Sequence, residues 1–436
     1  MKTTVRLEEH AVAKIDSALS RRVGVAVHRF ERWLESYGET SHDFQTFYAG
    51  RYGSFAKALY YRSRRLGAFA VAPMVFCEAF MPSARRFFWI PQRFPIADAH
   101  YAMGFARLFR HTGDRRCLKR AIHFLEVLLD TACHSKSGLG WGYPFEWVTI
   151  DGTIPRQTPL ITTLPYVYEA FGAVQEIEPD DRWLKTMHSI AEHAFHDYRD
   201  YDAGGGSATC TYSPLPWDRG RVVNANAYRA FLLTKAAFDF GDERYRQAAE
   251  RNLRFVLNSQ QPDGSWPYAI DGRRDFVDHY HTCFVLKGLL KIEKITGHRD
   301  CRQAIESGLR YYAQHLFDTE GLPRPFAKPP RLIVYRKELY DYAECINVLT
   351  LVLDRSTTLD SRLTAAIMDV IGPWQRADGS FRSRRLLFGW DNVPMHRWAQ
   401  AQLFRSLTGL LCSSAKSAIS PTAGRQTEMF CGSRVE

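Results

Sequence analysis

The sequence predicts an all-α protein built as a closed ring of six helical hairpins, an (α/α)6 toroid. Two kinds of helical segment alternate along the chain and recur about every 60 residues. One kind is amphipathic and follows a short turn, whereas the other is apolar on most sides and begins with a polar or aromatic residue. Repeats that each bury one face against a neighbour need either terminal caps or closure into a ring.

The amphipathic segments are expected to form the outer layer. Their opening turns align at Arg116, Arg182, Arg244 and Asp300, which lie 66, 62 and 56 residues apart. In these turns a glycine is expected to end the preceding helix and an acidic residue to cap the next one, because backbone groups at helix ends need partners.

The apolar segments are expected to form the inner ring. Their leading residues are spaced 63, 63, 55, 63 and 54 residues apart and are His100, Thr163, Asn226, His281, Glu344 and Trp398. The inner helices should cover residues 101–108, 164–171, 227–234, 282–289, 345–351 and 399–407. Long loops rich in glycine, proline and aromatics precede them, so loops and leading residues should surround the mouth of one central cavity.

The chain is expected to divide into three parts. Residues 1–60 are expected to be an N-terminal helical segment and residues 61–412 the toroid. Residues 413–436 are rich in Ser, Thr and Gly, with little apolar content, and are expected to be a disordered tail.

Composition narrows the class of protein. Of the 436 residues 45% are hydrophobic and 24% are charged, which are globular values. No apolar stretch is long enough to span a bilayer, so no integral membrane contact is expected. Residues 1–16 lack the apolar core of a secretory signal, and the nine cysteines are scattered, which predicts reduced thiols and a cytoplasmic location.

The net charge of +11 raises the question of a polyanionic partner. The basic residues occur as dispersed doublets, without a nucleic-acid-binding motif, so nucleic acid is not expected as a partner. An acidic sugar, a sugar phosphate or a polyanionic glycan is the preferred alternative, beside a basic surface that is merely solvated.

Two segments resemble a known repeat. Residues 251–266 (RNLRFVLNSQQPDGSW) resemble the glutamine–tryptophan motif of squalene and terpenoid cyclases, with Asn252 in place of a small residue, and residues 374–381 are a weaker match. In that motif the Gln caps helix ends and stacks on the aromatic. The same turn occurs in six-hairpin glycosidase-like toroids, among them sugar 2-epimerases, unsaturated glucuronyl hydrolases, polysaccharide lyases and uronyl 5-epimerases. The resemblance implies this fold over roughly residues 95–410.

Several other chemistries lack their motifs. The cyclase acid motif Asp-x-Asp-Asp has its nearest match at residues 178–181, where Glu178 stands first and the segment lies on a turn between hairpins. No Cys-Cys-His zinc set, phosphate loop, dinucleotide fingerprint or serine-hydrolase elbow is present in the sequence. No cofactor and no metal are therefore expected.

The expected catalytic residues are His100, Asp278, His281 and Glu344. Histidine transfers protons near neutral pH, and an adjacent carboxylate raises its basicity. His281 and His100 would carry the proton, and Glu344 would be their counterpart. The structural alternative is that Asp278 caps a helix and the histidines are buried against loop carbonyls; Asp98 and Asp341 could likewise serve the helix dipole.

A second set of residues is expected to bind substrate. Flat aromatic rings can stack on sugar rings, and polar neighbours can bind hydroxyl groups, although each aromatic could also simply pack its loop and Asn226 could cap its helix. The set comprises Trp141, Tyr143, Asn226, His279, Tyr280, Trp390, His396, Arg397 and Trp398.

Together these observations predict a carbohydrate-active protein of bacterial polysaccharide biosynthesis. It would modify an acidic sugar, a free or lipid-linked oligosaccharide or a nascent polysaccharide by metal-independent proton transfer of the epimerase, hydrolase or lyase type. A non-catalytic glycan-binding or assembly protein is one alternative, and in it no His or Glu at the mouth would have a perturbed pKa. A terpenoid cyclase-like enzyme is the other and would have an apolar cavity with a deep Asp.

Overall fold

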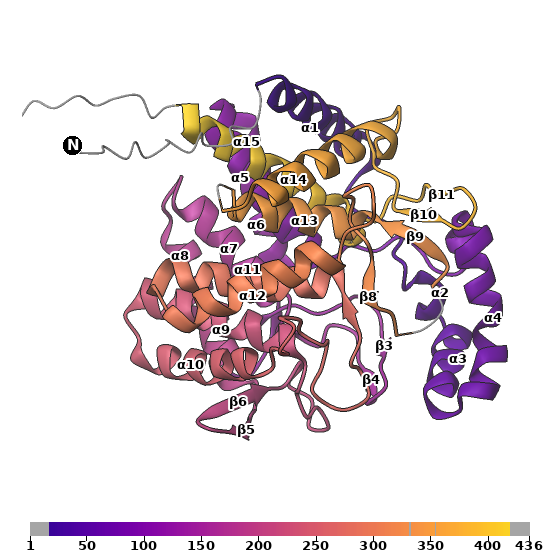
Figure 1. Cartoon of the computed structure of the whole chain (residues 1–436), viewed down its shortest axis with the longest axis horizontal. Coiled ribbons are helices and arrows are strands. Elements are labelled where there is room, and N and C mark those ends of the chain that lie inside the picture. Colours follow the sequence, from indigo (N-terminus) through magenta and orange to yellow (C-terminus); the bar gives the residue numbers. More distant parts are fainter. Residues whose placement is uncertain (1–16, 331–332, 354, 419–436) are drawn as a thin grey trace, which may run out of the picture.

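Six inner helices close into a ring in the computed structural model, which describes residues 17–330, 333–353 and 355–418 (Figure 1). Each inner helix packs on the next, and the last packs on the first. This confirms the (α/α)6 toroid and the predicted inner segments. The inner helices are α5 (Pro95–Thr112), α7 (Leu164–Gln175), α9 (Val223–Phe240), α11 (His279–Thr296), α13 (Leu339–Leu351) and α15 (Ala401–Ala418).

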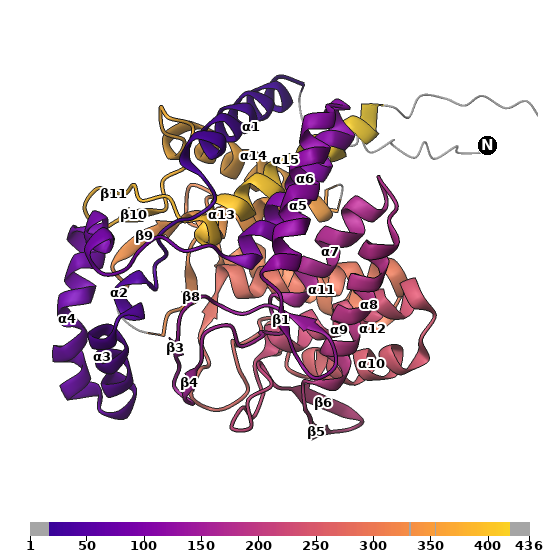
Figure 2. The ribbon, with the colours of Figure 1, turned by 180° about the vertical axis from the view of Figure 1, so that it is seen from behind.

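Five outer helices follow their inner partners along the chain, and each packs against the inner helix before it. They are α6 (Arg115–Asp130), α8 (Asp181–His196), α10 (Glu243–Asn258), α12 (Arg299–His315) and α14 (Thr357–Asp369). The sixth outer position is taken by α1 (Ser17–Tyr37), which packs on α15 and buries Phe30 and Trp33 in the common core. The sixth hairpin is thus assembled from the two ends of the described chain, which lie together in Figure 2.

The predicted caps form at three of the four outer turns. The carboxylates of Asp114, Asp180 and Asp242 accept the backbone N–H groups of the residues two positions later. The fourth turn differs, because α12 begins after His298 and has no side-chain cap, so Asp300 lies within its first turn.

The loops before the inner helices contain short antiparallel strands. The pairs are β1 (Cys133–His134) with β2 (Leu139–Gly140), β3 (Trp147–Val148) with β4 (Thr153–Ile154), β5 (Asp200–Gly204) with β6 (Ser207–Cys210), and β7 (Val277–Asp278) with β8 (Phe326–Lys328). A three-stranded sheet of order β11–β10–β9 joins β9 (Tyr335–Glu338), β10 (Arg384–Leu386) and β11 (Trp390–Asp391). These ladders stiffen the loops that surround the mouth.

A helical lobe lies at the side of the ring, next to the β9–β11 sheet (Figures 1 and 2). It contains α2 (Thr46–Ala49), α3 (Arg51–Arg62), α4 (Arg64–Phe80) and the 3₁₀ helix η1 (Pro82–Phe87) around a small core of its own. The fully buried ion pair between Arg85 and Asp391 (2.7 Å) fastens it to β11. The sequence-based division at residue 60 falls inside α3.

The C-terminal helix is longer than expected. Residues 413–418 continue α15, although they were expected to belong to a disordered tail. Leu407, Leu410 and Leu411 are buried in the core just before them, so the helix is already anchored and a few Ser, Ala and Lys residues can extend it. Residues 419–436 lie outside the described part of the chain.

The glutamine–tryptophan segment joins neighbouring repeats. Trp266 is buried, and its Nε1 donates to the carbonyl of Val256 in α10 at 3.0 Å. The resemblance implies that Gln260 caps a helix end; its Nε2 donates to the Gly264 carbonyl in its own turn and to the Ala304 carbonyl in the middle of α12, both at 3.0 Å. Gln375 makes the same contact with the Ala26 carbonyl of α1 at 2.8 Å, which shows that α1 occupies the next outer position.

Trp266→Ala should lower the free energy of unfolding by roughly 3–5 kcal/mol, because it leaves a cavity between α10 and α12. The matched control is Phe238→Ala, which removes an aromatic ring that is 72% exposed and should change stability by less than about 0.5 kcal/mol. Denaturant unfolding of both variants measures the difference. Equal stability of the two variants would contradict the structural role of Trp266.

Candidate functional site

A row of side chains winds along α11 from its N-cap. Asp278, His281, Phe284, Lys287 and Lys291 follow one another at intervals of three or four residues, a spacing at which each side chain is a neighbour of the next on the helix surface. The ring of Phe284 lies 5.6 Å from that of His281 and 5.1 Å from the Lys287 ammonium nitrogen. Phe284 therefore separates two polar levels, an upper level at the mouth and a lower level in the interior.

The upper level is centred on Asp278 and His281. The Asp278 carboxylate accepts the backbone N–H of His281 at 3.0 Å, as a helix cap, and also lies 2.6 Å from His281 Nδ1. Both the capping alternative and the predicted carboxylate–histidine pair are therefore present. With Nδ1 held by Asp278, Nε2 is the nitrogen left to exchange a proton, and the His281 side chain is 21% exposed.

A second carboxyl group, Asp341, lies close to this pair. It is buried, and neither of its oxygens has a hydrogen-bond partner among the described residues. Burial raises its pKa well above the usual range, and the charges of Glu338 and Asp278 raise it further. Asp341 is thus a buried carboxyl group whose neutral form is favoured, within electrostatic range of Asp278, the partner of His281.

Aromatic side chains surround the upper level. Tyr268 lies 4.6 Å from His281 between ring centroids, and Tyr280 lies 4.5 Å from it. Trp398 packs on Tyr340 at 4.3 Å, and Tyr340 in turn contacts Tyr280 at 5.2 Å. These rings come from α11, α13, the loop before α11 and the turn before α15, so the mouth is lined by aromatic faces from several hairpins.

Arg397 supports this aromatic wall from behind. Its guanidinium group forms a two-pronged ion pair with Asp43, at 2.6 and 2.9 Å, and lies 4.5 Å above the ring of Tyr143. The side chain is 4% exposed, so the charge is neutralised inside the protein. Arg397 lies against Tyr143 and Trp398 and serves there as a support for the rings.

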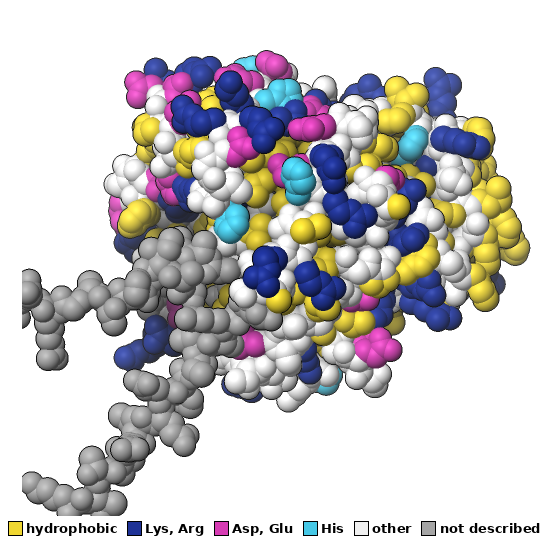
Figure 3. Space-filling model, turned by 90° about the horizontal axis from the view of Figure 1, so that it is seen from above, with side chains coloured by type: hydrophobic (Ala, Val, Ile, Leu, Met, Phe, Trp, Pro, Cys, Tyr) yellow, Lys and Arg dark blue, Asp and Glu magenta, His cyan; other side chains and the backbone are white. Residues whose placement is uncertain are grey.

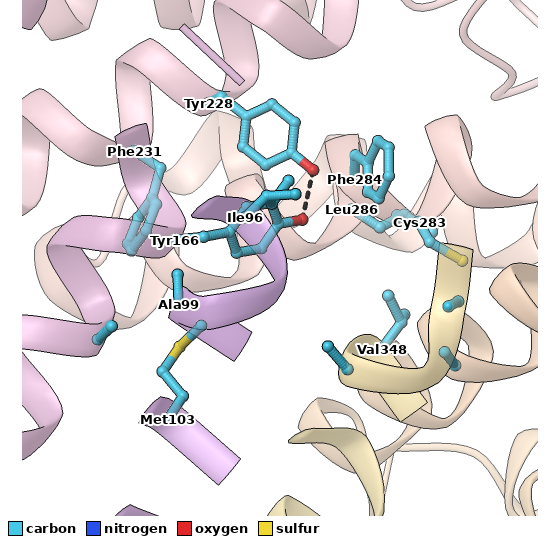
Figure 4. Close-up of a cluster of buried hydrophobic side chains, with 14 of the residues drawn as sticks. Ile96, Ala99, Met103, Tyr166, Tyr228, Phe231, Cys283, Phe284, Leu286 and Val348 are labelled. Carbon is cyan, nitrogen blue, oxygen red and sulfur yellow. Dashed lines mark hydrogen bonds between the residues drawn. The ribbon is translucent and has the colours of Figure 1, made fainter. Parts of the chain in front are cut away.

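The lower level is a network of buried charges. The Lys287 ammonium donates to Glu344 at 2.6 Å and to the hydroxyl of Tyr166 at 2.8 Å, and Arg405 lies 3.4 Å from the other oxygen of Glu344. Tyr166 is also bonded to Tyr228, hydroxyl to hydroxyl, as Figure 4 shows. A cavity of about 10 Å³, room for about one water molecule, lies beside these tyrosines and Lys287.

Positive charge exceeds negative charge at this level. Burial lowers the pKa of Lys287 to about 7. The attraction of Glu344 raises this pKa, whereas repulsion from Arg405 and Lys291 lowers it further. Burial alone would raise the pKa of Glu344, but the charges of Lys287 and Arg405 outweigh it and lower the pKa. Glu344 is therefore ionised, and Lys287 is poised to lose a proton near neutral pH.

His100 lies at the same depth and is fully buried. Its ring meets that of Tyr166 edge to face at 4.4 Å, and neither ring nitrogen has a hydrogen-bond partner among the described residues. Burial lowers its pKa well below the usual range, and the charges of Arg405 and Lys287 lower it further. His100 is therefore a neutral imidazole beside the charged network.

The depth of His100 and Glu344 corrects the expectation that every leading residue stands at a helix start. Helix α5 begins at Pro95 and α13 at Leu339, so both residues occupy the sixth helical position, about 8 Å along the axis from the first. His281 is only the third residue of α11. The six predicted leading residues therefore lie at different depths.

Four residues of the expected substrate-binding set are structural. Each is at most 1% exposed and has its polar atoms bonded within the protein, which leaves no surface for a sugar. Trp141 donates to the Leu128 carbonyl, and Asn226 ties β6 to α9. His279 contacts Tyr312 and two loop carbonyls, and His396 contacts Tyr101 and the Gly38 carbonyl.

Trp390 also lies apart from the mouth rings described above. It packs edge to face on Trp374 at 5.0 Å, with the guanidinium of Arg385 4.7 Å from its ring. Of the expected binding residues, the structure therefore places Tyr143, Tyr280 and Trp398 around the upper level.

Lys287 and Arg405 were not predicted from the sequence, nor were the tyrosines that face them. A usable signal was present: each is a cation inside a helix that is otherwise apolar on most sides, where a buried charge requires a partner. No group of three or more metal-ligating side chains suited to an ion occurs among the residues the structure describes. Within the same ranges no helix is long and apolar enough to cross a membrane.

Comparison with known proteins bears on the fold. No family model matches the chain, and no curated protein matches it in sequence. Among solved structures, it is similar to cellobiose 2-epimerase from Spirochaeta thermophila (TM-score 0.58, 14% identity, 80% of this chain and 99% of that one). The fold is that of the six-hairpin glycosidase-like toroids.

Two further structures have the same architecture. The unsaturated glucuronyl hydrolase of Bacillus sp. GL1, responsible for glycosaminoglycan degradation, superposes with a TM-score of 0.57 at 13% identity over 89% of this chain and 96% of that one. The GH76 α-mannanase of Bacteroides thetaiotaomicron gives 0.56 at 10% identity over 86% and 99%. At such identities the similarity establishes the fold alone.

The buried His396 makes stability depend on pH. Burial lowers its pKa from 6.5 to about 4, so the unfolded chain binds the proton more readily and stability is lost as the pH falls from 6.5 toward 4. This one group should cost about 2 kcal/mol between pH 7 and pH 5. His396→Gln cannot titrate, so urea unfolding should show a shallower loss over that range than in the wild type. Parallel curves for the two proteins would disprove the assignment.

Proposed function

We propose that this protein is a carbohydrate-active enzyme that modifies an acidic sugar, an oligosaccharide or a nascent polysaccharide by proton transfer at the upper level. The observation that carries the proposal is the Asp278–His281 pair at 2.6 Å, partly exposed and with the raised-pKa carboxyl group of Asp341 within electrostatic range of Asp278. A base and an acid at one mouth are what epimerisation, elimination and glycoside hydrolysis require in common.

The roles follow from the chemistry of each group. Asp278 accepts a hydrogen bond from Nδ1 of His281 and holds the ring in one orientation, so that Nε2 acts as the base. Asp341, whose pKa burial raises, is assigned the role of the acid that donates a proton to a leaving oxygen or a carbanion. This revises the expected assignment, in which Glu344 and His100 were the partners of His281, because both lie at the lower level.

The surroundings suit a sugar ring. Tyr268, Tyr280, Tyr340 and Trp398 present aromatic faces next to His281, and such faces stack on the C–H faces of pyranoses. The similar solved structures include an epimerase of cellobiose and hydrolases of glucuronyl and mannan substrates, which supports carbohydrate as the substrate class.

The charge of the interior favours an anionic substrate. Lys291, Arg405 and Arg107 carry three positive charges around the lower level and Lys287 is partly protonated, against two negative charges on Glu344 and Glu169. A carboxylate that approaches the mouth would be attracted by the unbalanced positive charge below it. A uronate or another acidic sugar therefore fits better than a neutral one.

The two alternatives predict other features. A cyclase needs an apolar interior for a polyene, whereas this interior holds the Lys287–Glu344–Arg405 network. A binding protein has no need for an acid with a strongly raised pKa at its mouth, yet Asp341 has one. A role in polysaccharide biosynthesis, on a lipid-linked or growing chain, remains part of the proposal.

His281→Gln and Asp341→Asn should each lower turnover by about 10²- to 10⁴-fold, because each removes one partner of the proton transfer. The assay incubates the protein with glucuronic-acid oligosaccharides in D2O and follows them by NMR. Deuterium at the carbon next to the carboxylate reports epimerisation, a new double bond reports elimination, and new reducing ends report hydrolysis.

The matched control is His134→Gln, which changes an exposed histidine in β1. Thermal melting must show that all three variants fold. Wild-type turnover in folded His281→Gln and Asp341→Asn would overturn catalysis at this site. Tight glycan binding without any turnover by the wild type would instead make the mouth a binding surface.

A further inference from the structure

The side lobe exposes an unusual amount of apolar surface. Ten of the 19 large hydrophobic side chains that the described residues expose lie between residues 52 and 90, in α3, α4, η1 and the residues after η1. Phe69 is 82% exposed, Phe87 76% and Ile90 72%. Figure 3 shows hydrophobic side chains gathered at the edge of the molecule that the lobe forms, interspersed with basic ones. A large exposed apolar patch of this kind is typical of a surface that binds another protein or a membrane.

The charges of the lobe are almost all positive. Residues 46–90 contain seven Lys and Arg residues and one acidic residue, Glu78. Glu78 is already paired with Arg384 of β10. Arg51, Arg62, Arg64, Arg65 and Arg86 are exposed, and none of them has an ion-pair partner in the described ranges of the chain. The surface is therefore both apolar and strongly cationic.

We infer that the lobe docks on the surface of a lipid bilayer that contains anionic lipids. Phe and Leu side chains on a helix can insert into the boundary between headgroups and acyl chains, while Arg and Lys beside them bind acidic headgroups. A second protein would have to supply a large acidic and apolar surface to match the lobe. An anionic bilayer supplies both over any area, which is why the charge pattern favours it.

The lobe is joined to the mouth of the ring. Helix α3 packs on β3, whose Trp147 contacts Tyr143 at 5.6 Å. Phe44, just before the lobe, lies 4.7 Å from Trp398, and Arg384 links Glu78 of α4 to Glu338 at the start of α13. A docked lobe would hold the mouth close to the membrane surface. Access to a lipid-linked glycan is a consequence that rests on the proposed function, whereas the docking itself does not.

Flotation with vesicles tests the docking on the whole protein. Wild-type protein should bind vesicles of phosphatidylcholine with about 30% phosphatidylglycerol at least about tenfold better than vesicles of phosphatidylcholine alone. Binding should weaken as salt rises from about 0.1 M to about 0.5 M, because the attraction between exposed charges is screened. His281→Gln should bind as the wild type does, so that failure of the proposed function leaves this result unchanged.

Two triple variants separate the apolar and the charged contributions. F69S/F87S/I90S and R64Q/R65Q/R86Q should each reduce binding to the anionic vesicles by about tenfold or more. The matched controls are Phe238→Ser, which removes an exposed ring on α9, and K119Q/K185Q/R310Q, which removes three exposed cations on α6, α8 and α12. Both controls should bind as the wild type does, and thermal melting verifies that every variant folds.

Three outcomes would overturn the inference. The first is wild-type protein that does not float with the anionic vesicles at low salt. The second is an equal loss of binding in the control triple, which would mean that net charge alone is responsible. The third is a wild-type protein that forms a dimer in light scattering and does not bind vesicles, together with an F69S/F87S/I90S variant that is monomeric. A second copy of the chain would then cover the lobe.

Discussion

The packing of α15 on α5 is the contact on which the rest of the structure depends, because it turns a row of hairpins into a ring. Gly104 of α5 makes it possible: a side-chain carbon there would lie 2.5 Å from the Phe404 ring, so only glycine lets the helices approach this closely. Closure gathers the loops of six hairpins around one mouth. It also encloses the side chains that face the axis, which is why Lys287, Glu344 and Arg405 meet from distant parts of the chain.

Enclosure has an electrostatic consequence. Lys287, Glu344 and Arg405 are each at most 2% exposed, and burying charges costs free energy that ion pairing only partly offsets. A ring that needed stability alone could fill the same space with apolar residues. The structure instead keeps an excess of positive charge below the mouth, and that excess adds to the effect of burial in lowering the pKa of Lys287. Such a network is typical of a functional interior.

The lobe of α3 and α4 depends on the ring without sharing its core. Its own core consists of only a few buried side chains. Ion pairs from Arg85 to Asp391 and from Glu78 to Arg384 hold the lobe beside the sixth hairpin. These pairs connect the lobe to the loops that also position Trp398 and Arg397. The aromatic mouth and the apolar, basic surface are therefore fixed relative to each other by the same short sheet.

The sequence by itself determined the repeat, the inner and outer layers and the Asp278–His281 pair, because helix periodicity, caps and near neighbours are local properties of the chain. It could not show that α1 completes the sixth hairpin, that Gln260 reaches α12, or that His100 and Glu344 lie below His281. It also left open the pairing of Lys287 with Glu344 and the state of Asp341. Those features depend on which distant segments meet, and only closure of the ring decides that.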